Sequence, residues 1–229
     1  LLNQADNKPQ AIFVSGGTFR GENPANGDNS GNPATFLLSG YQSTGADGVW
    51  TVSEAEGDFT ARVGLGRYAT LEDAFAACKD GDTVQLLADA EITTAIAVVD
   101  NVTFDLGTYT VSFSGDEVDD AQCAFQVAGT ADKPTTFTIT GTTGKLTSTY
   151  GVISIITNGC SFVLDGGTLE CDKGIVAEIY GGNLVCNEDY SDVTWGGLAE
   201  NKSITINGGK LRSGDGRAIN VGSPSVGKP

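Results

Sequence analysis

The sequence of 229 residues contains no histidine and no methionine, and it has only two tryptophans. Without histidine there is no imidazole for acid–base catalysis, for metal binding or for a histidine-dependent nucleophile triad. Without methionine, Leu1 is not a natural start, and we expect the chain to be an excised or processed piece of a longer protein. We find no signal peptide, no sorting tail and no apolar run of about 18 residues, so we expect no membrane insertion.

Basic residues are also scarce. The chain has 13 lysines and arginines against 29 acidic residues, which gives a formal net charge of −16. Such a charge repels the phosphates of nucleic acids and of anionic membranes, so neither is an expected partner. Solubility explains the charge more simply than a charge-specific role does.

The five cysteines do not follow a metal-binding pattern. They are Cys78, Cys123, Cys160, Cys171 and Cys186, and no two of them stand in a C-x-x-C motif. Because their number is odd, at least one cysteine keeps a free thiol if the others form disulfides within the chain. A buried cysteine often serves as a small apolar residue. The pairing of the others stays open, with a Cys160–Cys186 bridge as one alternative.

Glycine is abundant in the sequence, whereas proline is scarce. The 32 glycines are about twice the usual share, the six prolines are few, and no Gly-X-Y period is present. This composition indicates many tight turns between short strands. A hydrophobic share of 39% is enough for an ordered core.

An internal repeat carries the fold prediction. Segments 138–156, 162–179 and 204–221 align when each is anchored on one leucine, namely Leu146, Leu169 and Leu211. Each has glycines two residues before and five after its anchor, and small or apolar residues eight and ten after it. The apolar residues seven before the anchors are Ile139, Phe162 and Ile204. Apolar residues two apart share one face of a strand, so each unit reads as strand, turn, strand, turn, strand.

Stacking such units buries the apolar rows that a single unit would expose. The sequence therefore predicts an all-β chain folded over residues 67–229 as a right-handed parallel β-helix, or β-solenoid. Residues 70–79 predict a capping α-helix, with Thr70 as N-cap, Asp73 three residues later, and Leu71, Phe75 and Cys78 on one face. Residues 83–87 and 102–106 predict strands, and the polar stretch 187–202 predicts an inserted loop.

The N-terminal part, residues 1–66, looks like the end of a preceding module of the same type. Residues 12–19, IFVSGGTF, match the strand–Gly–Gly–strand portion of the repeat. A small β-rich closing unit with a hairpin around residues 45–48 follows. Whether Ile12 to Phe19 stacks within its own chain or on a neighbouring chain stays open.

These segments also carry a resemblance. The series SGGTF, GY, DGVWTV, YATLEDAFAACKDGDTVQLL and NVTFDLGTYTV resembles the β-helix modules of large surface proteins of Gram-positive gut bacteria. It is similar, more loosely, to pectate-lyase-like proteins. The resemblance implies an extracellular protein of the cell wall or cell surface with the role of an adhesin, and it carries over no catalytic residue.

The sequence does not favour an enzyme of the polysaccharide-cleaving kind. Asp119 and Asp120 are adjacent, so an extended chain points them in opposite directions. The remaining charged residues for a lyase-like site are Asp165, Asp172, Glu178, Arg212 and Arg217. Cross-unit ion pairs, Glu170 beside Arg212 and Lys173 beside Asp215, explain such charges better.

Calcium at the acidic loops 116–120 and 188–192 is a weaker alternative, because neither follows the EF-hand loop pattern. No cofactor is expected. The sequons at Asn101 and Asn201 are interpreted as coincidental.

The favoured function is a non-catalytic structural or adhesive surface module that self-associates head to tail into a filament. The alternative is an adhesin domain whose loop residues Tyr190 and Trp195 bind a glycan or a host protein. A second alternative is a polysaccharide-active enzyme.

Overall fold

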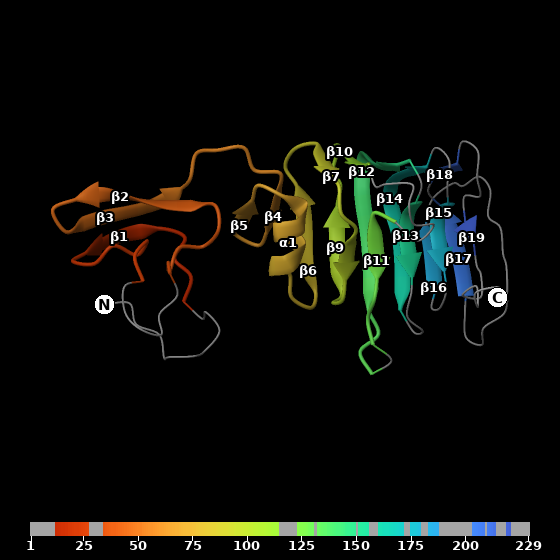
Figure 1. Cartoon of the computed structure of the whole chain (residues 1–229), viewed down its shortest axis with the longest axis horizontal. Helices are drawn as coiled ribbons and strands as arrows, with labels where there is room; N and C mark the ends of the chain where they lie inside the picture. Colours follow the sequence, from red (N-terminus) through yellow and green to blue (C-terminus); the bar gives the residue numbers. More distant parts are fainter. Residues whose placement is uncertain are drawn as a thin grey trace, which may run out of the picture.

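The structure of the protein is a computed structural model that describes residues 12–27, 34–114, 123–130, 132–149, 151–155 and 160–171, and the backbone of five further strands. The elements follow one another along one long axis, from β1 at one end to β17, β18 and β19 at the other (Figure 1). Within these residues there are three sheets and one helix.

The first sheet is small and antiparallel. It has the order β1-β3-β2, with β1 Gly17–Arg20, β2 Tyr41–Ala46 and β3 Val49–Glu54. The turn between β2 and β3 has positive φ at Asp47 (53°) and Gly48 (72°), the pattern of a type I′ hairpin. The predicted hairpin is therefore confirmed. Val14, Phe36 and Val52 form the small core beneath this sheet.

The second sheet has eleven strands and is curled. Its parallel strands are β6 Asp82–Leu86, β7 Ala90–Ile92, β9 Val102–Asp105, β10 Thr110–Phe113, β12 Thr136–Ser148, β14 Ser161–Cys171, β16 Asn183–Asn187, β17 Ser203–Gly208 and β18 Lys210–Ser213. Two short strands, β4 Ala61–Val63 and β5 Gly66–Tyr68, join it antiparallel beside β6. The predicted strands at 83–87 and 102–106 correspond to β6 and β9.

The third sheet is parallel and has five strands: β8 Ile96–Val98, β11 Phe125–Val127, β13 Gly151–Ile155, β15 Ile175–Ile179 and β19 Ile219–Asn220. It encloses the main core together with the curled sheet. Phenylalanine rings join the two sheets, with Phe104 of β9 and Phe125 of β11 5.5 Å apart at their centroids. Both side chains are fully buried.

The β-solenoid prediction is wrong. The fold is mostly β with one short helix, and its mixed sheets include a curled half-barrel and a parallel sheet. The strand rows are unequal: β16 lies between β14 and β17, whereas β18 pairs directly with β14. Antiparallel β4 and β5 break the parallel order at the opposite end.

The glycines of the repeat explain the error. The repeat pattern places these glycines between short strands. In the structure β14 continues through Gly166 (φ 119°) and Gly167 (φ 80°), so these residues bend one long strand. Because these long strands bend instead of ending, the two separate faces that the repeat predicts become one curled sheet. Fixed offsets in a sequence specify which residues are neighbours, but they do not specify where a strand ends.

The repeat alignment itself was partly right. Leu146, Leu169 and Leu211 stand opposite one another in adjacent strands, as predicted. Ile139, however, pairs with Leu164 instead of Phe162, because β12 has an irregularity between Gly141 and Lys145. On the five-stranded sheet the apolar row of β13 is Ile153 and Ile155, one residue earlier than the expected Ser154 and Ile156.

The predicted helix forms and ends two residues early. Helix α1 spans Leu71–Ala77, and the Thr70 hydroxyl accepts a hydrogen bond from the Asp73 N–H at 3.2 Å, as the capping pattern predicted. Leu71 and Phe75 are buried, and Cys78 is an extended C-cap residue. The Phe75 ring lies 5.3 Å from Phe104 and 5.2 Å from Phe125, so the helix covers one end of the core.

The strand register argues against the Cys160–Cys186 bridge. Cys186 stands opposite Leu164, four residues along β14 from Cys160. At about 3.3 Å per residue their Cα atoms are roughly 13 Å apart along the strand direction. A disulfide needs less than about 7 Å. Cys160 is fully buried, in agreement with the small apolar role expected for these cysteines.

Candidate functional site

Several sites predicted from the sequence lie outside the described residues. Tyr190 and Trp195, the expected binding residues, are among them, as is most of the predicted loop 187–202. So are both acidic loops, 116–120 and 188–192, and the predicted pair Lys173 and Asp215. The structure therefore does not test these predictions.

The charged residues that are described do not gather into a site. Among residues with described side chains, no group of three or more histidine, cysteine, aspartate or glutamate residues is placed to hold a metal ion. Glu170 stands opposite Arg212 in the strand register, as predicted, and its carboxylate lies 3.5 Å from the Lys145 ammonium. Asp165 is exposed on β14.

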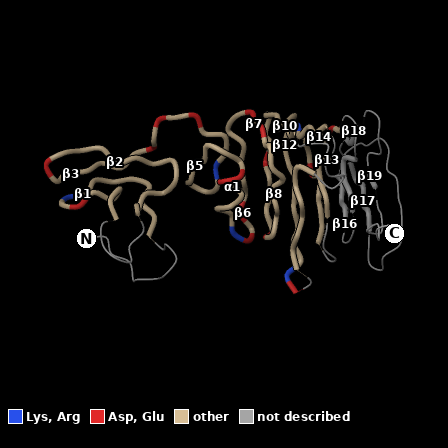
Figure 2. Tube along the Cα trace, in the orientation of Figure 1, with Lys and Arg blue, Asp and Glu red and all other residues tan. Residues whose placement is uncertain are grey.

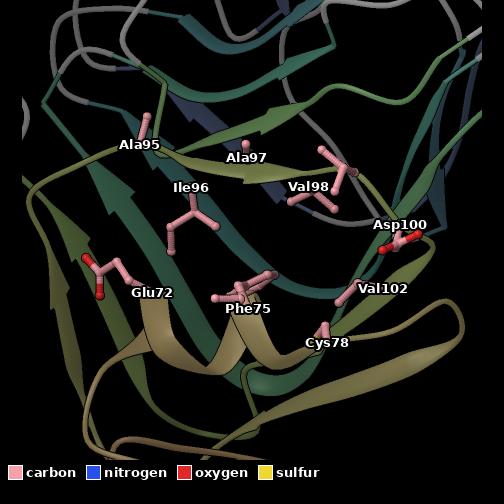
Figure 3. Close-up of a pocket in the computed structure, with 11 residues that line it drawn as sticks. Glu72, Phe75, Cys78, Ala95, Ile96, Ala97, Val98, Asp100 and Val102 are labelled. Carbon is pink, nitrogen blue, oxygen red and sulfur yellow. The ribbon is translucent and has the colours of Figure 1, made fainter. Parts of the chain in front are cut away.

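The candidate site is a groove between helix α1 and strand β8 (Figure 3). Its volume is about 360 Å³. Phe75 and Val102 line its apolar part, Ala95 to Val99 form its far wall, and Glu72 and Asp100 place carboxylates at its borders. The groove is thus apolar inside and acidic at its margins.

Strand β8 gives this groove an open hydrogen-bonding edge. The Ile96 N–H donates to the Ala124 carbonyl at 2.9 Å, and the Val98 carbonyl accepts from the Ala128 N–H at 2.9 Å. Because backbone groups alternate in a parallel strand, those of Ala97 point away from β11. Within the described part of the chain, β8 pairs with β11 alone. An extended peptide could add to this edge in the way that peptides extend other sheets.

Cys78 lines the same groove but is not activated. The pKa of Cys78 is raised to about 11, mainly by burial and to a smaller extent by the negative charges of Asp82 and Asp100. The thiol lies 3.4 Å from the Ala74 carbonyl and donates to it. A thiol with such a pKa is almost entirely protonated at neutral pH, so it is a poor nucleophile and a poor metal ligand.

A polar corner beside the groove contains a hydrogen-bond network that the sequence did not reveal. The Asn101 side-chain amide donates to the Asp80 carboxylate at 2.7 Å, and its carbonyl accepts from the Thr136 N–H at 2.8 Å. Asn101 therefore joins three consecutive segments of the stack. Lys133 forms an ion pair with Asp100, and this hydrogen bond raises the pKa of Lys133. In the sequence, Asn101 stands out only as part of an N-x-T glycosylation motif, and that motif does not indicate these hydrogen bonds.

Acidic residues dominate the part of the molecule from the first sheet to helix α1. They line the end of the β2–β3 hairpin, the connection from β3 toward β5, and helix α1 (Figure 2). Residues 71–100 contain seven acidic residues and one basic residue. The groove therefore favours neutral or basic ligands over acidic ones.

Comparisons with protein-family models, with curated proteins and with solved structures gave no match. The described residues include no helix that is long and apolar enough to cross a membrane.

Proposed function

We propose that the chain is a non-catalytic, structural module of an extracellular cell-wall or cell-surface protein, and that its copies associate end to end. The observation that supports this most is the apolar core that runs through successive strands in fixed register. Val84, Phe104, Ile139 and Leu164 form one such row, each opposite the next, and all four are fully buried. Buried apolar residues thus extend the core along one axis, and this arrangement suits a structural scaffold.

The two ends of the stack differ, which supports directional association. At the first end, α1 and the β4–β5 hairpin lie over the core and protect part of the sheet edge. At the far end, β17, β18 and β19 are each paired on one side only within the described residues. The resemblance to bacterial surface modules supports the extracellular location.

Light scattering and electron microscopy on the purified chain test this proposal. We expect the mean mass to rise with concentration and the particles to be elongated, with a repeat close to the length of one molecule. Particles that remain monomeric up to the solubility limit would contradict end-to-end association.

The groove beside β8 favours a second candidate, an adhesin domain that binds an extended segment of a host protein. The open backbone of Ala97 and the apolar wall fit a peptide strand better than a glycan, which has no backbone N–H groups for the edge. The predicted loop residues Tyr190 and Trp195 offer a separate surface for a glycan or host protein.

Binding arrays of glycans and extracellular host proteins separate these surfaces. Ala97→Pro removes an N–H that points away from β11, so it should abolish peptide addition and leave the sheet intact. Ala97→Ser is its matched control. Loss of binding in Trp195→Ala, with normal binding by Ala97→Pro, would move the site to the loop. If Trp195→Ala changes stability alone, that residue has no binding role.

A further inference from the structure

Strand β8 is the last strand of its sheet among the strands that the structure describes, and all of its residues pair with β11. The hydrogen bonds on both sides of Ala97 fix the direction of its own backbone groups. The Ile96 N–H and the Val98 carbonyl each bond to the β11 side at 2.9 Å. The N–H and the carbonyl of Ala97 therefore face the opposite way, into the groove that this residue lines.

This open edge is short and has a defined end. The Val99 carbonyl accepts a hydrogen bond from the Thr135 hydroxyl at 3.0 Å, so it is already occupied. Ala97 is exposed, and the Val99 side chain is 53% exposed, which gives the groove an apolar rim. A bound strand can therefore use the backbone of Ala97 and end near Val99.

The groove has the form that a bound strand requires. Helix α1 and strand β8 run alongside each other in the same direction, with Glu72 at one end and Asp100 at the other (Figure 3). The side chains of Phe75 and Ile96 lie between them. The volume of about 360 Å³ is within the range of about 300–1,000 Å³ that ligand pockets have. Side chains of an added strand that point inward would contact the Phe75 ring.

Carboxylates stand at both ends of the groove. Glu72 lies at one end and takes part in none of the ion pairs formed between described residues. At the other end Asp100 forms an ion pair with Lys133, and Asp82 adds a second negative charge, because both carboxylates raise the pKa of the Cys78 thiol. Both ends of the groove therefore attract cationic groups.

Charge also indicates what kind of molecule occupies the groove. The chain has a net charge of −16, so a second copy would bring a mainly acidic surface to an acidic groove. A basic partner is attracted instead. An extended peptide also supplies the backbone N–H and carbonyl groups that pair with those of Ala97, which a glycan does not.

We infer that the groove binds an extended basic segment of a partner protein, which adds as a strand beside β8 with apolar side chains facing Phe75 and cationic side chains near Glu72 and Asp100. Residues 95 to 99 span about 13 Å at about 3.3 Å per residue, so the two cationic residues stand four apart in the segment. The second and fourth of its five residues face inward and are apolar. This rests on the second candidate function, peptide binding by an adhesin domain, and names the class of its partner.

Three synthetic peptides test this with the unaltered protein, by fluorescence anisotropy of labelled peptide at low salt. They are the basic peptide Lys-Val-Thr-Val-Lys, the acidic peptide Glu-Val-Thr-Val-Glu, and the basic peptide with its three central amides N-methylated. The basic peptide should bind at least about tenfold more tightly than the acidic one, because both end charges change sign. High salt should reduce this difference by screening. The methylated peptide cannot donate to the Ala97 carbonyl and should not bind.

Two variants locate the charge, and one amide locates the strand. Glu72→Gln should weaken binding of the basic peptide by up to about fivefold, the size of an exposed ion pair, and leave the uncharged peptide Ser-Val-Thr-Val-Ser unaffected. Glu56→Gln makes the same change at an exposed residue that does not line the groove, and is the matched control. The Ala97 amide should exchange its hydrogen more slowly in the complex, as measured by NMR.

Each contrary result has a separate meaning. Equal affinity for the basic and acidic peptides, or equal effects of Glu72→Gln and Glu56→Gln, would refute a basic partner and leave the groove as a peptide site. Undiminished binding of the methylated peptide, or an unprotected Ala97 amide, would refute strand addition at β8. Reduced self-association of Ala97→Pro would identify a second copy as the occupant and refute the inference. If none of the peptides binds, both this inference and the second candidate function are wrong, and end-to-end association is unaffected.

Discussion

Replacing Phe125 by alanine should remove a large part of the stability of the molecule. The Phe125 ring is fully buried in the first layers of the core. Its centroid lies 5.2 Å from Phe75, 5.5 Å from Phe104 and 5.1 Å from Phe137, so from the five-stranded sheet it contacts the helix and the curled sheet. A buried phenylalanine truncated to alanine costs about 3–5 kcal/mol, through lost burial and the cavity that remains. We expect the upper half of this range because three ring contacts are lost together.

Urea denaturation, with the free energy of unfolding extrapolated to water, measures this effect. Phe125→Leu keeps most of the apolar volume but loses the ring contacts, so it should cost about 1–2 kcal/mol. Phe13→Ala removes an equally large but half-exposed ring and should cost under about 1 kcal/mol at dilutions where the chain is monomeric. The packing argument fails if Phe125→Ala and Phe13→Ala destabilise the chain equally.

Three further substitutions or titrations address other features. Gly40→Ala should cost more than about 2 kcal/mol by urea denaturation, since φ is 80° and a Cβ would lie 2.5 Å from the Arg67 Cβ. Gly64→Ala, where φ is 57° and nothing lies within 4 Å, should cost only about 1 kcal/mol, and equal costs would count against the steric argument. Asn101→Ala should cost about 1–3 kcal/mol by the same assay, because it removes hydrogen bonds to two neighbouring segments; an unchanged midpoint would show that they contribute nothing. Because the pKa of Cys78 is raised from 9.0 to about 11, its stability contribution is present below pH 9 and is lost as the pH rises to about 11. Cys78→Ser should flatten that part of the pH–stability curve, and a curve identical to the wild type would contradict the assignment.

The sequence predicted local structure better than architecture. Thr70 and Asp73 identified the helix start, and the β2–β3 hairpin followed from its glycines, because both depend on residues a few positions apart. The anchors Leu146, Leu169 and Leu211 identified a long-range register correctly, because buried rows must align. The β-solenoid was wrong because nothing in the pattern distinguishes a glycine that ends a strand from one that bends it, as Gly166 and Gly167 do.

The groove beside β8 was not predictable from the sequence. Ala97 carries no polar side chain, and its role depends on which direction its backbone groups face after β8 pairs with β11. Cys78 was predicted to share the buried face of the helix, but the helix ends before it and leaves it half-buried at the groove. The division of the chain at residue 66 and the loop residues Tyr190 and Trp195 remain predictions.

The hydrogen bonds of Asn101 have a practical consequence for the choice of expression host. Asn101 begins an N-V-T sequon, and its amide nitrogen, the atom to which an N-linked glycan attaches, donates to Asp80. A eukaryotic secretory pathway that adds an oligosaccharide before folding is complete would leave a bulky sugar where two neighbouring segments must meet. Production in yeast or mammalian cells should therefore yield misfolded material from the natural sequence, whereas bacterial production, which leaves Asn101 bare, should not.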